Sequence, residues 1–229
     1  MFWNEEEKAE GAFVIPDDVV DLNFKVRCRQ LPIDHADALY NALTNELPWL
    51  ADESLAAIHL VHGAESGNGW IRPENPQDLI FPSRRTRFTL RLPKQRIEDA
   101  HALDGKMLDL GDYQIVLSQP SVRLLSTQTT IFSRHVISEH AEDEDAFLQA
   151  MYDALVAKDI VIKKMMGGRS MPLQIEGKQV QTQSLMIDGL KVEESIRLQQ
   201  EGLGEGQKHG CGIFLPHKGI DAVNTEQEK

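Results

Sequence analysis

The most distinctive stretch of the chain lies near its end and reads Gly202-Leu203-Gly204-Glu205-Gly206-Gln207-Lys208-His209-Gly210-Cys211-Gly212. Five glycines in eleven residues weaken any helix or strand, so the backbone here must need positive φ angles or close approach to another segment. Periodicity predicts a helix over 192–201 before this glycine loop and a strand over 213–215 after it. That order excludes the Rossmann and P-loop motifs. A phosphate would be held by loop amides with Lys208 and His209, and a turn without a ligand is the alternative.

The glycine spacing resembles a known motif, in which two Gly-hydrophobic-Gly triplets flank five residues that include a Lys or Arg. The matching positions are Gly202, Leu203, Gly204, Lys208, Gly210, Cys211 and Gly212, supported by Ser184-Leu185-Met186 upstream and Phe214-Leu215-Pro216-His217-Lys218 downstream. The chain therefore resembles the CRISPR-associated RAMP endoribonucleases that cut CRISPR precursor RNA, in particular their MYXAN-subtype branch.

This resemblance implies an α+β fold of tandem ferredoxin-like domains and an enzyme that binds CRISPR repeat RNA. In that family the RNA 2′-OH attacks the adjacent phosphate, which gives a 2′,3′-cyclic phosphate and a 5′-OH without a metal or other cofactor. The implied partners are the repeat RNA, the crRNA and other subunits of a CRISPR effector complex.

Composition points to a soluble, cytoplasmic protein that does not enter a membrane. No apolar run approaches the ~18 residues of a membrane span, and the acidic residues 1–10 do not resemble a signal peptide. Cys28 and Cys211 are the only cysteines and form no CxxC motif, so we expect reduced thiols and no cysteine zinc site. No HExxH motif or carboxylate cluster is visible either, so the sequence predicts no metal site.

The net charge of −12 at pH 7 argues against nucleic-acid binding, which depends on Lys and Arg. The charge is unevenly spread, however. The run 83–96 contains six basic residues and no acid, and the run 163–169 adds three basic residues. A local basic groove on an acidic protein is therefore expected.

The order of the predicted elements favours two ferredoxin-like units, each β-α-β-β-α-β. In the first unit we expect strands over 19–28, 57–62, 86–92 and 114–117, with a helix that Asp34 caps and a second helix over 94–103. In the second we expect a strand over 122–137, a helix over 142–157, a strand over 160–164, a turn at Gly167-Gly168 and a strand over 180–187, before the helix and glycine loop described above. The predicted domains are an acidic segment 1–18, units 19–120 and 121–220, and a polar tail 221–229.

His35 is the first candidate for catalysis, because it follows Asp34 and opens the first helix. Partial positive charge at a helix N-terminus disfavours imidazolium, so a neutral base is expected there. Such a group could deprotonate a ribose 2′-OH or protonate the leaving 5′-oxygen. The alternative is that His35 extends the apolar stripe of Leu39 and is packed. The family resemblance implies a catalytic histidine in or next to this helix.

His62 is the second catalytic candidate, because it ends a predicted strand beside a loop with Ser66 and Asn68. His59 and His62 are three residues apart and so lie on opposite strand faces, which excludes a shared metal. His59 and Tyr40 are weaker candidates.

The predicted RNA-binding residues combine the basic runs with the glycine loop: Arg84, Arg85, Arg87, Lys164, Arg169, Gly202, Gly204, Lys208, His209, Gly210 and Gly212. Two other classes of function compete. A non-catalytic RAMP subunit holding crRNA would keep the glycine loop without needing His35, and a small-molecule regulatory module would fit the acidic charge but leave the basic runs unexplained.

Overall fold

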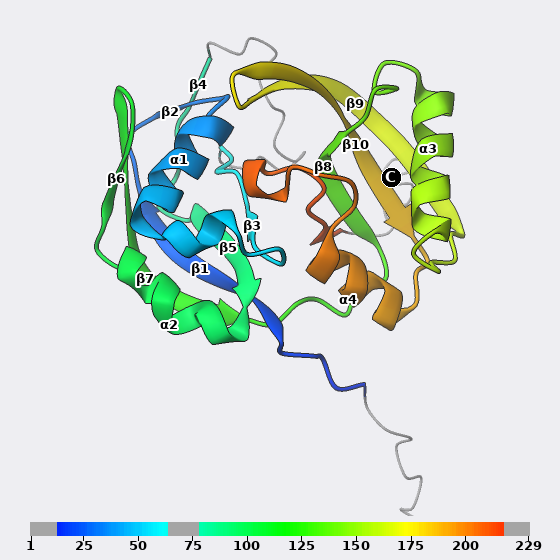
Figure 1. Ribbon diagram of the computed structural model, residues 1–229, viewed down its shortest axis with the longest axis horizontal. Coiled ribbons are helices and arrows are strands. Elements are labelled where there is room, and N and C mark those ends of the chain that lie inside the picture. The colour runs from blue at the N-terminus through cyan, green and yellow to red at the C-terminus, as the bar shows by residue number, and fades with distance from the viewer. Residues whose placement is uncertain (1–12, 64–77, 218–229) are drawn as a thin grey trace, which may run out of the picture.

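The computed structural model describes residues 13–63 and 78–217, which form two antiparallel sheets with helices (Figure 1). The first five-stranded sheet has the order β3-β5-β1-β7-β6, and the second four-stranded sheet has the order β11-β8-β10-β9. With β6 set aside as a hairpin extension of β7, both sheets have the strand order of a ferredoxin-like fold. The predicted α+β class with ferredoxin-like units is confirmed.

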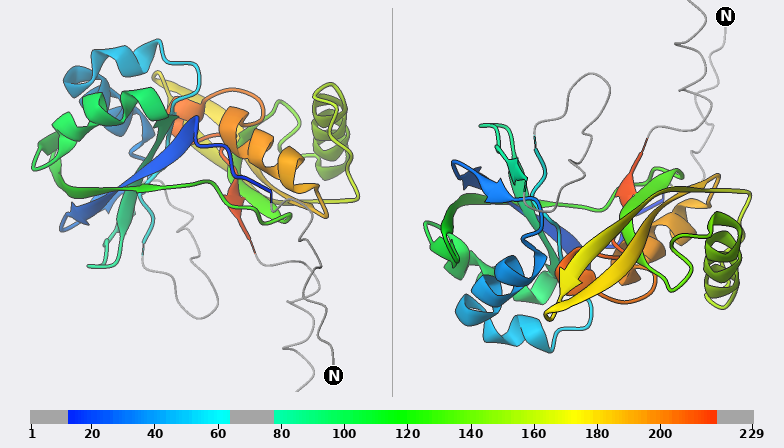
Figure 2. Two further views of the ribbon diagram at one scale, coloured as in Figure 1. Left: turned by 90° about the horizontal axis from the view of Figure 1, so that it is seen from below. Right: turned by 90° about the horizontal axis from the view of Figure 1, so that it is seen from above.

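The first unit places helices on one side of its sheet (Figure 2). Its strands are β1 (Val19–Arg27), β3 (Ala57–Ile58), β5 (Arg87–Pro93), β6 (Met107–Leu110) and β7 (Tyr113–Arg123), with a separate pair β2 (Leu31–Pro32) and β4 (Leu79–Ile80). Its helices are α1 (Ala36–Glu46), η1 (Pro48–Ala51) and the continuous series η2 (Lys94–Arg96), α2 (Ile97–Ala100) and η3 (His101–Leu103).

The core of the first unit follows from strand alternation. Leu22, Phe24 and Val26 on β1 are buried with Leu39 and Leu43 of α1, whereas Lys25 and Arg27 are exposed on the other sheet face. The predicted period-two pattern of the first strand and the helical i, i+4 stripe are thereby both confirmed.

The second unit repeats the plan with its own core around Phe147, Leu185 and Phe214. Its elements are β8 (Ile131–Ile137), α3 (Glu144–Val156), β9 (Lys164–Ile175), β10 (Lys178–Asp188), α4 (Val192–Glu201), η4 (Gln207–His209) and β11 (Leu215–Pro216). The predicted helices over 142–157 and 192–201 are confirmed to within two residues.

The prediction of one long strand over 122–137 was wrong. Arg123 still pairs with Asp21 in the first sheet, whereas Ile131 is the first residue of β8 in the second. Residues 124–130 therefore connect the units, and the first sheet extends three residues beyond the predicted boundary at 120. Thr129 and Thr130 suit extended backbone as well as strand, so composition could not separate the two.

The predicted turn at Gly167-Gly168 was also wrong, because both glycines lie inside β9. The hairpin turn falls instead at Glu176-Gly177, and both residues have positive φ. A Cβ atom at Gly168 would lie 2.3 Å from Oγ of Ser184 on the neighbouring strand. These glycines permit close packing rather than chain reversal.

Two expectations from composition concern the described residues alone. Cys28 and Cys211 are both free thiols, as predicted. Across the described ranges, no helix is long and apolar enough to span a bilayer.

Candidate RNA-binding and catalytic site

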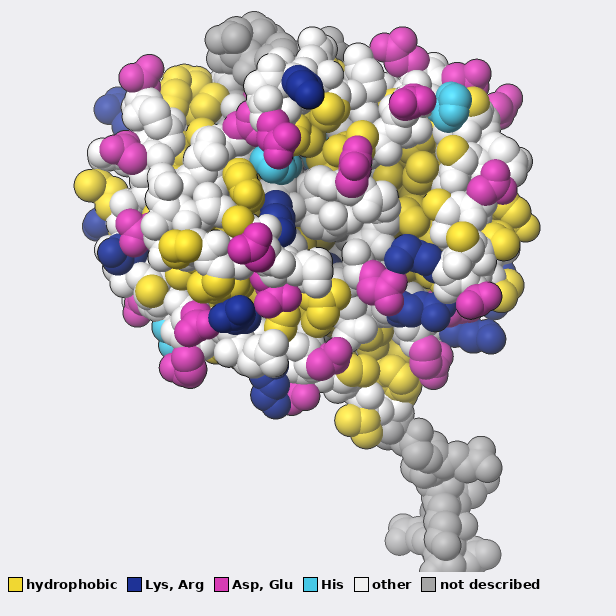
Figure 3. All heavy atoms as spheres, in the orientation of Figure 1, with side chains coloured by type: hydrophobic (Ala, Val, Ile, Leu, Met, Phe, Trp, Pro, Cys, Tyr) yellow, Lys and Arg dark blue, Asp and Glu magenta, His cyan; other side chains and the backbone are white. Residues whose placement is uncertain are grey.

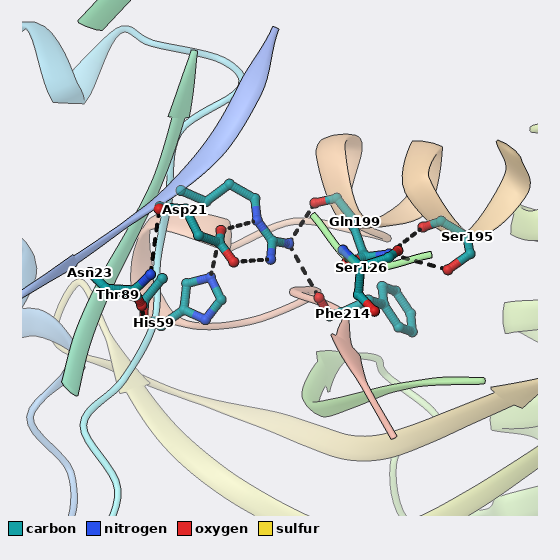
Figure 4. Close-up of polar contacts among 9 residues, drawn as sticks. Asp21, Asn23, His59, Thr89, Ser126, Ser195, Gln199 and Phe214 are labelled. Carbon is teal, nitrogen blue, oxygen red and sulfur yellow. Dashed lines mark hydrogen bonds and ion pairs between the residues drawn. The ribbon is translucent and has the colours of Figure 1, made fainter. Parts of the chain in front are cut away.

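The two units are joined by the buried side chain of Arg91 on β5, which is 1% exposed (Figure 4). Its Nε and Nη2 atoms donate to the two carboxylate oxygens of Asp21 at 2.7 and 3.1 Å. Its Nη1 atom donates to the carbonyls of Gln199 in α4 and Phe214 beyond the glycine loop, at 2.6 and 3.2 Å. The sequence counted Arg91 in a basic run, but its charge is neutralised inside the protein.

His59 lies beside this ion pair, with Nε2 4.0 Å from a carboxylate oxygen of Asp21. Burial lowers the pKa of His59 to about 4, and the charge of Arg91 acts in the same direction, while Asp21 opposes both. His59 is therefore a neutral residue of the joint between the units.

The structure contradicts the expectation that His35 faces the RNA. Its side chain is 2% exposed, and both ring nitrogens contact the backbone. Nδ1 lies 2.9 Å from the carbonyl oxygen of Pro32, and Nε2 lies 3.1 Å from the backbone nitrogen of Val61. The packed role that the sequence held as the alternative is the one observed.

The predicted cap of α1 by Asp34 was wrong as well, because His35 itself occupies the N-cap position without a side-chain cap bond. Asp34 accepts instead from the backbone nitrogen of Gln174 on β9 at 3.0 Å. Asp37 accepts from the backbone nitrogens of Glu176 and Gly177 at 2.8 and 3.1 Å. The start of α1 therefore holds the β9–β10 hairpin of the second unit, which sequence patterns within one unit cannot reveal.

His62 lies in a hollow of about 760 Å³ together with all three predicted arginines of the first run. We call this the arginine groove, and it is lined by Leu60, His62, Gly63, Ser83, Arg84, Arg85, Thr86 and Arg87. Arg84, Arg85 and Arg87 are exposed, and His62 is half-buried. Two predictions made from separate stretches of sequence therefore meet in one place.

A turn built from its own side chains shapes the arginine groove. The Nη1 atom of Arg87 donates to the carbonyls of Arg84, Arg85 and Thr86 at 3.3, 3.1 and 3.1 Å. The backbone nitrogen of Ser83 donates to the hydroxyl of Thr86 at 2.9 Å. Arg87 therefore orders the turn, and Arg84 and Arg85 lie on it rather than within a strand as predicted.

A second, narrower hollow begins at the same histidine. Leu60 and His62 also line a cleft with His59, Arg134, His135, Gly210, Ile213 and Leu215. Arg134 and His135 come from β8, so the second unit contributes basic and polar groups next to His62. The sequence analysis did not select Arg134, because one arginine in an alternating strand carries no signal by itself.

The glycine loop has the positive φ angles that the sequence predicted, at Gly202, Gly204, Gly206, Gly210 and Gly212. Several of its amides are already used within the protein, however. The backbone nitrogens of Gly202, Gly210 and Gly212 donate to the carbonyls of Leu198, Gln207 and His135 at 2.9, 3.3 and 2.6 Å. The expectation that these three amides hold a phosphate is therefore wrong.

The glycine loop instead packs closely on the first unit. A Cβ atom at Gly210 would lie 2.4 Å from Cγ of Leu60, a residue of the arginine groove. By contrast, a Cβ atom at the exposed Gly204 would meet nothing within 4 Å. Glycine at position 210 thus lets the loop support the segment that carries His62.

His209 and Lys208, predicted to contact RNA phosphate, contact the first unit. His209 is 7% exposed, its ring centroid lies 4.6 Å from that of Tyr40, and its Nε2 lies 3.4 Å from Asp37. Burial lowers the pKa of His209, although Asp37 and Glu176 favour its charged form. The Nζ atom of Lys208 donates to the carbonyl of Ala51.

These two residues line a hollow of about 510 Å³ between α1, the β9–β10 hairpin and the glycine loop. Glu176 and Glu205 line it with Lys178 and Lys208, so its charges are mixed. Figure 3 shows acidic and basic side chains interspersed over this whole face, without a continuous basic surface. This hollow is consequently less suited to a polyanion than the arginine groove.

The remaining predicted contacts lie on β9. Arg169 is exposed, and Lys164 is half-exposed with Nζ 3.9 Å from Asp188. Across residues 13–63 and 78–217, no three His, Cys, Asp or Glu side chains converge as a metal site would require.

The fold and this arrangement of basic residues define a protein of the RAMP class. The Cas6 CRISPR family model matches residues 20–219. The CRISPR-associated endonuclease Cas6 of Myxococcus xanthus (strain DK1622) is 32% identical over 197 residues, which cover 86% of this chain and 81% of that protein. The chain belongs to the Cas6 family, and the resemblance noted from the sequence is confirmed.

Solved structures agree on the fold at much lower identity. A RAMP protein described as binding different RNA substrates has a TM-score of 0.61 at 12% identity, covering 87% of this chain and 100% of that one. A Cas6-related protein from Pyrococcus furiosus has a TM-score of 0.58 at 10% identity, covering 87% and 99%.

Proposed function

We propose that this chain is an endoribonuclease that binds CRISPR repeat RNA and cleaves precursor crRNA in the arginine groove, with His62 transferring protons. Membership of the Cas6 family and the endonuclease name of its Myxococcus relative support the reaction class. The single observation that carries the location is that His62 lines the same hollow as Arg84, Arg85 and Arg87.

These residue types suit RNA transesterification. The 2′-oxygen forms a bond to the adjacent phosphorus while the bond from phosphorus to the 5′-oxygen breaks, which leaves a 2′,3′-cyclic phosphate and a 5′-OH. A histidine can take the 2′-OH proton or supply one to the leaving oxygen, because its ordinary pKa lies near neutrality. Arginine guanidinium groups stabilise the extra negative charge of the phosphorane. This route needs no metal ion.

Other predicted residues have supporting roles in this proposal. Arg169 and Lys164 on β9 contact RNA backbone away from the cut, and the exposed Gly204 leaves the tip of the glycine loop open to it. His35 is not assigned proton transfer, since its two nitrogens are held by Pro32 and Val61. Processed crRNA and other CRISPR effector subunits are the further partners.

The test is cleavage of the cognate repeat RNA by purified protein in EDTA, with product length and end chemistry read together. We expect one cut, a cyclic phosphate end and full activity without divalent metal. His62→Ala should lower the single-turnover rate by about 10²- to 10⁴-fold while RNA affinity changes little, because proton transfer acts in the transition state.

His101→Ala is the matched control, because His101 lies on η3 and is outside the arginine groove. Wild-type protein that binds repeat RNA tightly but never cuts it would support the non-catalytic RAMP subunit instead. If wild-type protein cuts and His62→Ala cuts at the same rate, the chemistry lies elsewhere than the arginine groove.

A further inference from the structure

The sheet of the first unit has a second face that α1 and α2 do not cover (Figure 2). On β1, Phe24 and Val26 point into the core, so Asn23, Lys25 and Arg27 point to the opposite side. Lys25 and Arg27 are exposed, and Asn23 is half-buried. We call the surface formed by these residues and their cross-strand neighbours the open face.

Strand register identifies those neighbours. Lys25 lies opposite Arg87 on β5 and opposite Ser118 on β7. Asn23 lies opposite Thr89 and Ser121, and Asp21 lies opposite Arg91 and Arg123. The open face therefore carries the cations Lys25, Arg27, Arg87 and Arg123 with short hydroxyl and amide side chains between them.

Acidic residues are nearly absent from these strands, although the chain contains 36 of them. Asp21 is the only acid in β1, β5 and β7, and both of its oxygens are occupied by the buried Arg91. Lys25 and Arg87 are like charges directly opposite each other, which destabilises a sheet unless an anion lies over them. The open face is thus complementary to a polyanion.

Two further features specify the ligand. Arg87 belongs both to the open face and to the arginine groove, so a strand in that groove can continue onto the sheet. The aromatic residues Phe24 and Phe88 are buried on the other side, so the open face offers no ring on which bases could stack. It is suited to phosphates rather than to bases.

We propose that the open face binds the phosphate backbone of a single-stranded segment of the RNA that enters the arginine groove, without reading its bases. This inference rests on the proposed RNA substrate and adds Lys25, Arg27 and Arg123 to the residues that hold it. Hydroxyl and amide groups of Asn23, Ser118 and Ser121 supply further donors to phosphate oxygens.

The test is the double variant Lys25→Gln/Arg27→Gln, measured for binding of repeat RNA between low and moderate salt. Two lost phosphate contacts on a single strand should weaken binding at low salt and reduce the slope of log K against log salt by about 1.4. The effect should be equal for an RNA whose bases in the unpaired flank are scrambled, because no base is read.

The matched control is Lys106→Gln/Lys158→Gln, which removes the same charge from residues paired with Glu46 and Glu201. Its salt slope should remain that of the wild type. If wild-type protein binds and cuts the RNA but both double variants have the same slope, the open face is not part of the interface. If wild-type protein does not bind repeat RNA at all, the proposed function itself is wrong. Thermal unfolding of each variant verifies that it is folded.

Discussion

The Nε2 atom of His35 accepts a hydrogen bond from the backbone nitrogen of Val61, the residue that precedes His62. Because a backbone nitrogen is always a donor, Nε2 must be unprotonated and Nδ1 must donate to Pro32. Protonation of Nε2 would place two donors face to face. His35 therefore fixes the segment that carries His62, and it cannot accept a proton without breaking that link.

We predict that His35→Ala lowers stability by about 2 to 4 kcal/mol, since it removes a buried ring and leaves the Val61 nitrogen unpaired. The cleavage rate should also fall, because the His62 segment loses its support. The pH profile of single-turnover cleavage, measured well below the lowered melting temperature, should keep the limbs seen in the wild type. Loss of one limb with normal stability would instead identify His35 as a proton-transfer group.

The arginine groove should bind RNA through Arg84 and Arg85, whose side chains are exposed on the turn. Arg84→Gln/Arg85→Gln should weaken repeat binding and make its salt dependence shallower by about one unit per lost phosphate contact. Arg87 is left intact in this test because its guanidinium orders the turn. Filter binding across salt concentrations measures the slope, and a slope equal to that of Lys106→Gln/Lys158→Gln would exclude both arginines.

The glycine loop should tolerate alanine at position 204 far better than at position 210. Both positions have positive φ, so each substitution strains the backbone by about 1 kcal/mol. Only Gly210→Ala also drives a Cβ atom into Leu60. Urea unfolding should therefore show the larger loss for Gly210→Ala, with cleavage reduced because Leu60 lines the arginine groove. Equal losses would mean that the loop does not support that segment.

The sequence predicted what depends on local pattern. Alternation in β1 and the stripe containing Leu39 and Leu43 in α1 report which side chains are buried, and burial is decided within one element. Glycine density likewise predicted the positive φ angles of the glycine loop. These features require no knowledge of the partner segment.

The site was less predictable because its roles depend on contacts between distant segments. Arg91 reads as one more cation of a basic run, and only its contacts with Asp21 and Gln199 show that it is buried. Gly168 reads as a turn until its distance to Ser184 is known. His35 and His62 are both plausible bases in sequence, and burial separates them.

Arg91 should be essential to the joint between the two units. Arg91→Met leaves the carboxylate of Asp21 buried without its cation, which should cost about 3 to 5 kcal/mol. Adding Asp21→Asn removes that charge, so the double variant should be more stable than Arg91→Met alone. Chemical unfolding of the wild type, both single variants and the double variant gives the coupling energy. Additive losses would mean that the ion pair contributes no coupling.

His59 should make the protein less stable as the pH falls from about 6.5 to about 4. Burial lowers the pKa of His59 in the folded protein to about 4, whereas an unfolded histidine titrates at about 6.5. Between these values the unfolded chain binds the extra proton, so protonation favours unfolding and stability rises with pH. A difference of about 2.5 pH units corresponds to about 3 kcal/mol, fully lost below the lower value.

The variant His59→Gln isolates this contribution, because it removes the titrating group while other ionisable residues stay the same. The free energy of unfolding of wild type minus variant should be constant above pH 7 and fall between pH 6.5 and pH 4. The ion pair of Asp21 titrates in a separate window: the pKa of Asp21 is lowered because Arg91 outweighs burial, so its stabilisation is lost only below about pH 4. Parallel stability curves from pH 7 to pH 4 would show that His59 is not buried as a neutral side chain between the two units.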